Sequence, residues 1–226
     1  MVIIVLVRHG ESTANVGGVL AGRTPGVVLT ETGRTQARGL GGVFPCREVT
    51  ELRYSPLERC AQTTGELLEG ITAARITEAP EFLEVDYGRW SGRTIPELAK
   101  LPEWEIVQQR PSEVAFPDGE RLADAAARAV AGVRAFVADL QDSGAEAPVG
   151  VVVAHGDIIK AVLADALGMP LDDFQRIAVA PGSFSQIVYP SPGPGTGAPT
   201  VTAMSVTAPT ARGARTGEAG TLGGGV

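Results

Sequence analysis

The chain has 226 residues, with 26 acidic against 19 basic side chains and a formal net charge of −7. This excess of negative charge repels polyanions, so neither nucleic acid nor an anionic membrane is expected as a partner. Hydrophobic residues make up 44% of the chain, enough for a core, and no run approaches the roughly 18 consecutive apolar residues of a membrane helix. Length and composition therefore favour one globular domain, with or without a tail.

Short apolar or β-branched runs predict strands at residues 2–7, 52–55, 74–77, 150–154 and 184–189. Helical patterns lie between or after these runs, at residues 30–44, 56–68, 118–140 and 156–168. Strands that alternate with helices are typical of βαβ units, which have a parallel sheet. We therefore expect an α/β fold, a three-layer αβα sandwich with a mostly parallel central sheet.

Two segments depart from this alternation. Residues 88–117 contain four prolines and two tryptophans, and an irregular excursion of this kind over one end of a sheet usually shapes a substrate pocket. Residues 190–226 are rich in Gly, Pro, Thr and Ala and offer little apolar surface to offset the entropy of ordering. We predict a folded domain at 1–189 and a disordered tail at 190–226, whose removal should leave stability unchanged.

The chain has two histidines, His9 and His155, and each directly follows a predicted strand and precedes a glycine. Ligands of open α/β sheets bind beyond the carboxyl ends of the strands, so the two imidazoles should meet there. Arg8 precedes His9, and Arg59 lies one turn into the helix after strand 52–55. Although each alone is more often structural, the four side chains together predict a clamp for phosphate oxygens.

Several blocks then carry a family resemblance. Residues 6–15, 22–24, 29–37, 55–63, 84–92 and 152–156 occur in an order similar to that of the histidine phosphatase superfamily. The first block contains Arg8-His9-Gly10-Glu11, which resembles the signature of that superfamily. An isolated Arg-His-Gly tripeptide would be weak evidence, but ordered blocks that span residues 1–189 are strong evidence.

The resemblance implies a phosphomonoesterase that hydrolyses a small phosphorylated metabolite through a phosphohistidine, with no metal and no cofactor. It implies that His9 is the nucleophile, that Arg8, Arg59 and His155 hold the phosphoryl oxygens, and that Glu84 is the general acid and base. The two guanidiniums and a protonated His155 would supply the counter-charge, because phosphoryl transfer depends on positioning and charge neutralisation.

The resemblance also implies that Asn15 contacts the phosphate and that the substrate approaches Gly22 closely. Spacing alone does not distinguish Glu84 from Glu81 or Asp86, and Asp86 remains the alternative for proton transfer. For attack, His9 must be neutral at Nε2, so a backbone carbonyl should hold its Nδ1–H.

Two other functions stay open. Mutases that resemble this chain place an arginine directly after the glutamate and an arginine pair further along, whereas Val85 follows Glu84 and residues 88–117 contain no such pair. Water is therefore expected to accept the phosphoryl group, and a cofactor-dependent phosphoglycerate mutase is the alternative enzyme. A catalytically silent phosphate-binding regulatory module is the alternative of another class, although a decayed member typically lacks one of the site residues and this chain lacks none.

The remaining residues carry weaker signals. Cys46 and Cys60 show neither zinc nor disulfide spacing, and with no leader segment a cytoplasmic location is expected; Cys60 should be a core residue. Three aromatic residues could line the pocket or cover the sheet: Tyr87, Trp90 and Trp104. Three arginines hint at additional negative charge on the substrate, Arg89, Arg93 and Arg110. Neither the natural substrate nor the oligomeric state can be read from the sequence.

Overall fold

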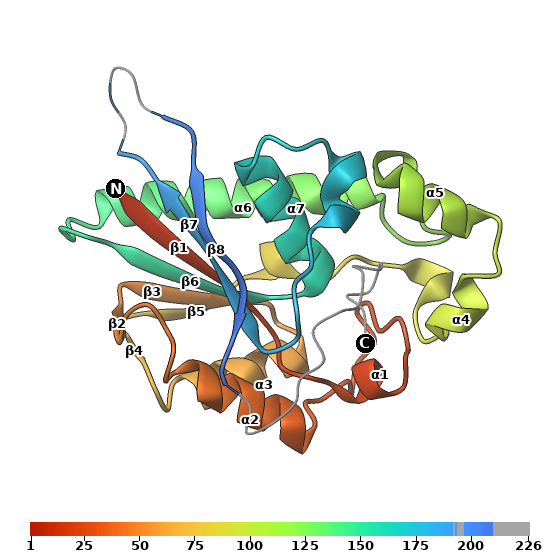
Figure 1. Cartoon of the computed structure of the whole chain (residues 1–226), viewed down its shortest axis with the longest axis horizontal. Coiled ribbons are helices and arrows are strands. Elements are labelled where there is room, and N and C mark those ends of the chain that lie inside the picture. The colour runs from red at the N-terminus through yellow and green to blue at the C-terminus, as the bar shows by residue number, and fades with distance from the viewer. Residues whose placement is uncertain (192, 194–196, 210–226) are drawn as a thin grey trace.

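A computed structural model describes residues 1–191, 193 and 197–209. Its central sheet has six strands in the order β5-β3-β6-β1-β7-β8 (Figure 1). The bounds are β1 Val2–Arg8, β3 Glu51–Tyr54, β5 Ile76–Glu78, β6 Val149–Ala154, β7 Ser183–Tyr189 and β8 Thr200–Thr207. The first four strands along this order run parallel, and β7 and β8 join antiparallel. The mostly parallel sheet is therefore confirmed.

Helices cover both faces of this sheet (Figure 1). One face carries α6 and α7, and the other carries α2 and α3, with bounds Leu122–Asp142, Gly156–Ala166, Glu31–Leu40 and Glu58–Leu67 respectively. Successive residues of β1 point to opposite faces, so Ile4 and Leu6 join the core under α6 and α7, while Val5 and Val7 join the other. This arrangement confirms the three-layer sandwich.

Shorter elements complete the chain. They are α1 Thr13–Val16, a two-stranded sheet of β2 Glu48–Val49 and β4 Thr72–Ala73, and the 3-10 turns Pro80–Phe82, Gly88–Trp90, Pro111–Glu113 and Leu171–Arg176. The excursion predicted at 88–117 is partly helical, with α4 Ile95–Leu98 and α5 Glu103–Gln109. The helix predicted from residue 118 begins at Leu122 instead, because Asp118 has a left-handed backbone with φ of 58°.

The predicted tail is wrong over residues 200–207, which form β8. Three of its apolar side chains, Val201, Ala203 and Val206, pack against the two cores, and its backbone pairs with β7. An edge strand of Thr, Val and Ser needs less apolar surface than a central strand, so composition hid it. Residues 192, 194–196 and 210–226 lie outside the described residues, and the prediction of disorder stays a prediction there.

None of the helices in the described part of the chain has both the length and the apolar character needed to cross a lipid bilayer.

Candidate active site

The register between β1 and β6 places the two histidines side by side. Arg8 at the end of β1 pairs with Ala154 at the end of β6, so His9 and His155 leave neighbouring parallel strands at the same edge. Their ring centroids lie 5.3 Å apart with an interplanar angle of 61°, and both side chains are buried. The structure thus brings together the two imidazoles as the strand ends predicted.

Both predicted arginines are buried beside these rings. Arg59, in the first turn of α3, donates from Nε to His9 Nε2 at 3.3 Å and from NH2 to the carbonyl oxygen of Gly22 at 2.8 Å. Arg8 donates from NH1 to the carbonyl oxygen of Val179 at 2.5 Å. Burial lowers the pKa of Arg8 to about 10, so this guanidinium is still charged near neutral pH.

The surroundings of His9 fix its tautomer. Its Nδ1 lies 2.7 Å from the carbonyl oxygen of Gly10, which can only accept, so Nδ1 carries the proton and Nε2 keeps its lone pair. Burial, followed by the charges of Arg59 and Arg8, holds the pKa of His9 well below its usual value. The ring is therefore neutral, and its Nε2 lone pair faces Arg59.

The protein groups around His155 favour its neutral form and not the protonated form that was expected. Its Nε2 lies 2.8 Å from Ser55 Oγ, and the Cys60 thiol lies 3.5 Å from the same nitrogen. Burial and then the charge of Arg59 hold the pKa of His155 well below its usual value. The fixed counter-charge therefore comes from Arg8 and Arg59, and a charged His155 would need the negative charge of the phosphate itself. Cys60 is a fully buried thiol whose pKa burial raises to about 12, as expected for a core residue.

Glu84 and its alternative, Asp86, differ in environment. Glu84 is 5% exposed and lines the same pocket as His9. Burial, and then the charge of Asp157, raise the pKa of Glu84 to about 7, although Arg59 and Arg8 oppose the shift. Asp86 is half-buried, and its carboxylate accepts from the backbone of Gly88 at 3.0 Å. This geometry favours Glu84 as the proton donor, whereas the Asp86 carboxylate stabilises the turn at Gly88.

Asn15 and Gly22 line the pocket with His9, Arg59 and Glu84. Asn15 sits at the third position of α1, where its Oδ1 accepts from the backbone and hydroxyl of Ser12 at 3.0 and 2.8 Å. Gly22 has φ of +52°, and a Cβ there would lie 3.0 Å from the ring of Tyr87 and 2.9 Å from Ser91 Oγ. This position therefore requires glycine.

The loop that carries His9 lies tightly against α2. A Cβ on Gly10 would lie 2.2 Å from the carbonyl oxygen of Gly33, and a Cβ on Gly33 would lie 2.0 Å from that of Glu11. The Gly10 amide also donates to Thr63 Oγ1 at 3.1 Å. Both glycines fall inside the motif blocks, but nothing in the sequence showed that they meet.

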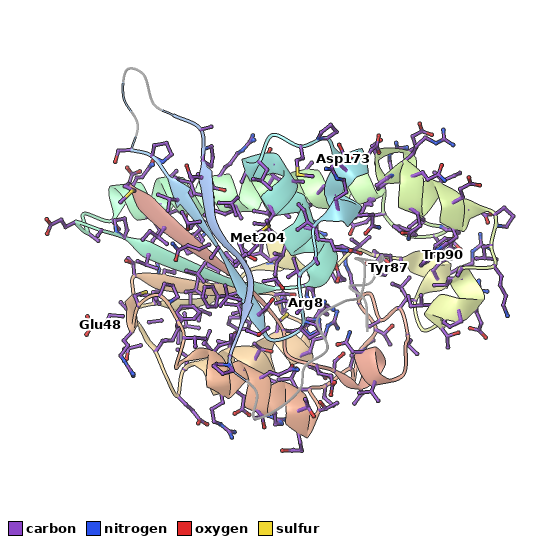
Figure 2. All side chains as sticks on the ribbon, in the orientation of Figure 1. Arg8, Glu48, Tyr87, Trp90, Asp173 and Met204 are labelled. Atoms are coloured by element: carbon purple, nitrogen blue, oxygen red, sulfur yellow. The ribbon has the colours of Figure 1, made fainter. Side chains whose placement is uncertain are left out.

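The structure separates the three aromatic residues left open by the sequence. Tyr87 lines the pocket, whereas Trp90 and Trp104 stack on each other with centroids 6.1 Å apart. Figure 2 shows Trp90 out among α4 and α5, with Tyr87 closer to the sheet. The Tyr87 hydroxyl donates to Asp157 Oδ2 at 2.6 Å. Sequence reasoning missed Asp157, although an acid directly after His155-Gly156 in a mostly apolar helix was a visible signal.

Other possible sites carry less chemistry. Among the described residues, no group of three or more His, Cys, Asp or Glu side chains is arranged to hold a metal ion. A larger hollow between α6 and α7 is lined mainly by alanines and other apolar side chains, with Arg134 and Asp165 at its edge. These two residues pair with each other at 2.8 Å, so the hollow offers no nucleophile or free clamp for phosphoryl transfer.

Comparison with known proteins agrees with this geometry. The sequence model of the histidine phosphatase superfamily (branch 1) matches residues 4–196. Phosphoserine phosphatase 1 from Hydrogenobacter thermophilus is 31% identical over 83% of this chain and 86% of its own length. A glucosyl-3-phosphoglycerate phosphatase from Mycobacterium tuberculosis is 31% identical over 77% of this chain and 79% of its own. A 2,3-bisphosphoglycerate-dependent phosphoglycerate mutase from Azorhizobium caulinodans is 32% identical over 71% and 79%.

Solved structures show the same fold. The structure titled Mycobacterial hydrolase 1 covers 91% of this chain and 99% of its own, with a TM-score of 0.78 and 27% identity. The native mycobacterial glucosyl-3-phosphoglycerate phosphatase covers 90% and 98%, with a TM-score of 0.74 and 26% identity.

Proposed function

Because the chain belongs to the histidine phosphatase superfamily (branch 1), we propose that it hydrolyses a small phosphomonoester through a phosphohistidine on His9. The observation that carries this proposal is a pocket lined by the neutral imidazole of His9, the guanidinium of Arg59 and the carboxyl group of Glu84, with Arg8 and His155 buried beside it. Such a set supplies a nucleophile, a clamp for the phosphoryl oxygens and a proton donor.

In the first step, the phosphate dianion lies against Arg8, Arg59 and His155, and His9 Nε2 attacks phosphorus. The P–O bond to the substrate breaks as the N–P bond forms, and Glu84 gives its proton to the departing oxygen. The pKa of about 7 supports this role, because a large fraction of Glu84 carries a proton at neutral pH.

In the second step, water attacks the phosphohistidine. Glu84, now ionised, accepts a proton from this water, and the N–P bond breaks to return neutral His9 and inorganic phosphate. The second step leaves Glu84 protonated again, so the cycle closes without another proton donor.

The buried charges support a dianionic ligand. Lys160 lies 3.6 Å from Asp157, so this ion pair adds no net charge to the buried site. The guanidiniums of Arg8 and Arg59 remain, and with Glu84 protonated they match the two negative charges that a phosphate monoester approaches at neutral pH.

The pocket rim supports a small substrate with one phosphate. Its walls include four apolar residues, Ala14, Val19, Leu20 and Ala21. The rim is linked to the excursion by hydrogen bonds from Leu20 N to Arg93 O and from Ile95 N to Gly18 O. Arg89 and Arg110 are exposed and pair with Asp118 and Glu113, so these arginines give little support to a substrate with additional negative charge.

The acidic surface supports the absence of a nucleic-acid partner. The thiols of Cys46 and Cys60 are both free, which fits the cytoplasm, the location we propose.

Trapping the intermediate tests the function. Wild-type protein is mixed with a phosphorus-labelled aryl phosphate, quenched within milliseconds and analysed for acid-labile label. We expect a burst of label on His9 that decays as inorganic phosphate, and no label in His9→Ala of unchanged circular dichroism. A wild-type protein that takes up no label would be a silent binding module, and label that passes to added phosphoglycerate rather than to water would identify a mutase.

A further inference from the structure

Two buried charges lie behind the pocket and take no part in the steps above. Asp157 and Lys160 stand one turn apart in α7, and each is 1% exposed. Lys160 Nζ lies 3.6 Å from Asp157 Oδ1 and donates to Gln175 Oε1 at 3.1 Å. Removing an ion from water carries a penalty of several kcal/mol, so a pair retained in a core needs an explanation beyond packing.

Asp157 connects this pair to the pocket wall. Its Oδ2 accepts from the Tyr87 hydroxyl at 2.6 Å, and Tyr87 lines the pocket together with Glu84. Asp157 also lies in the first turn of α7, where the helix dipole favours a negative charge. The carboxyl group of Asp157 therefore meets the Tyr87 hydroxyl, the Lys160 ammonium and the amino-terminal turn of α7.

The two arginines of the phosphate clamp have opposite effects on phosphate binding and on proton donation, and a fixed anion nearby would balance them. Arg8 and Arg59 must be charged to bind phosphate, but the same charges draw the proton from Glu84 and would leave no donor for the leaving group. A permanent negative charge close behind the pocket opposes that pull without approaching the phosphate.

We propose that Asp157 is a positioning residue, a fixed buried anion that keeps the proton on Glu84 while Tyr87 and Lys160 hold it in place. The inference rests on the proposed role of Glu84 as the proton donor. Asp157 touches no reacting atom and acts through its charge alone.

Every element packed around Glu84 contributes to the balance. The titratable and charged groups around its side chain are Arg8 at the end of β1, His9 directly after it, Arg59 and Cys60 in α3, Tyr87, His155, and Asp157 and Lys160 in α7. Its main chain meets Arg23, which donates to the Glu84 carbonyl oxygen at 2.8 Å and pairs with Glu120. Of these groups, Asp157 has the largest effect on the pKa of Glu84 through its charge, and burial alone has a larger one. The charge of Asp157 raises this pKa and so keeps the proton on Glu84.

The test is the pH profile of kcat/KM in Asp157→Asn, an isosteric change that removes the charge but leaves an acceptor for Tyr87. An alkyl phosphate requires the proton of Glu84, so its rate should fall on the basic side as Glu84 ionises. We expect this basic limb to move down by roughly one to two pH units, as a unit charge several ångströms away predicts at an intermediate dielectric. At pH values above the basic limbs of both proteins, kcat/KM of the variant for the alkyl ester should be roughly tenfold or more below that of wild type. For p-nitrophenyl phosphate, whose p-nitrophenolate group leaves without a proton, kcat/KM should change much less.

Three variants control the sign and the place of the effect. Lys160→Met removes the opposite charge, so its basic limb should move up. Asp165→Asn removes an acid from the same helix that pairs with Arg134 at the surface, so its limb should not move. If Asp157→Asn fails to fold, Asp157→Asn/Lys160→Met leaves no unpaired buried charge, and its limb should still move down because Asp157 dominates the pair at Glu84.

Glu84→Gln separates the two proposals. If the basic limb survives in Glu84→Gln, the donor assignment and with it the proposed mechanism fail. If the limb disappears in Glu84→Gln but does not move in a folded Asp157→Asn or in the double variant, only the present inference fails. An equal loss with both substrates and no shift would make Asp157 merely structural, which also overturns it.

Discussion

Arg59 Nε lies 3.3 Å from His9 Nε2, so the guanidinium that we propose to bind phosphate donates a hydrogen bond to the lone pair of the proposed nucleophile. A phosphate dianion is a stronger acceptor than a neutral imidazole, and it should take this N–H as it binds. Burial and then Arg59 lower the pKa of His9, and under the proposed mechanism the same guanidinium would hold the phosphoryl group after binding. The other end of its guanidinium stays fixed on the Gly22 carbonyl oxygen at 2.8 Å.

Arg59→Lys should lower kcat/KM by roughly 10²–10³-fold, as loss of a preorganised donor to the transition state does in other enzymes. Lysine keeps a charge but cannot span His9, Gly22 and a phosphate oxygen with one planar group. Steady-state kinetics with p-nitrophenyl phosphate measure the loss. The matched control is Arg34→Lys, an arginine of α2 that pairs with Glu66 at the surface, and its activity should match wild type. A folded Arg59→Lys within about threefold of wild type would contradict the clamp.

Glu84→Gln should slow hydrolysis of alkyl phosphates by roughly 10²–10⁴-fold, the usual contribution of a general acid. An alkoxide needs the proton in the transition state, whereas p-nitrophenolate leaves well without one, so the activated ester should still phosphorylate His9. The phosphoenzyme should then persist longer, because the base that activates water is also missing. Rapid-quench measurement of phosphohistidine follows both effects.

The control for that variant is Asp86→Asn, which removes the other candidate acid. Asp86 accepts from the backbone of Gly88, so we expect a small loss that is equal for both leaving groups. Leaving-group dependence in Asp86→Asn alone would show that Asp86, and not Glu84, is the donor.

The pH profile of the wild-type protein follows from the same carboxyl group. Glu84 donates only when protonated, and its pKa lies at about 7, so kcat/KM for an alkyl phosphate should be highest below that pH and fall tenfold per unit above it. His9 stays neutral through this range because its pKa is held well below its usual value. Kinetics between pH 5 and 9, with the alkyl and the aryl ester compared, measure the limb. A basic limb of equal size with p-nitrophenyl phosphate would assign it to another group.

Activity should survive an excess of EDTA. The positive charges in and beside the pocket belong to Arg59 and Arg8, which are part of the chain and cannot be removed by chelation. Turnover of p-nitrophenyl phosphate before and after treatment, with metal-free buffers, checks this expectation. A loss of activity that Mg²⁺ or Zn²⁺ restores would mean that a metal takes part in the reaction.

The sequence predicted the core of the site because that information is local. An apolar run that ends in Arg8-His9-Gly10 and another that ends in His155-Gly156 mark two buried strands and their ends, and the geometry of parallel sheets then brings the ends together. The spacing from residues 52–55 to Arg59 also fixes one turn of helix. These inferences need no knowledge of how distant side chains pack.

What the sequence did not predict depends on tertiary contacts. Asp157 and Lys160 read as polar residues of a helix, and only packing of α7 against Tyr87 and Gln175 buries them. The approach of Gly10 to Gly33 likewise joins two segments that no local pattern relates. The strand β8 was missed for a similar reason, since its few apolar side chains are sufficient only because β7 offers a paired edge.

The last prediction concerns β8, which also supports the site. Ser205 Oγ accepts from the backbone of Ala180 at 2.8 Å, next to the Val179 carbonyl oxygen that binds Arg8. A chain that ends at Pro199 lacks β8, whereas one that ends at Pro209 keeps it, and neither contains residues 210–226. Loss of the half-buried Val201 and Val206 should remove about 2–3 kcal/mol of stability, and the Tm of the shorter chain should lie roughly 5–10 °C below that of the longer one. Thermal unfolding followed by circular dichroism measures the difference, and kcat/KM should fall in the shorter chain as Arg8 loses a fixed partner. Equal melting temperatures would show that residues 200–207 add no stability, as composition alone had predicted.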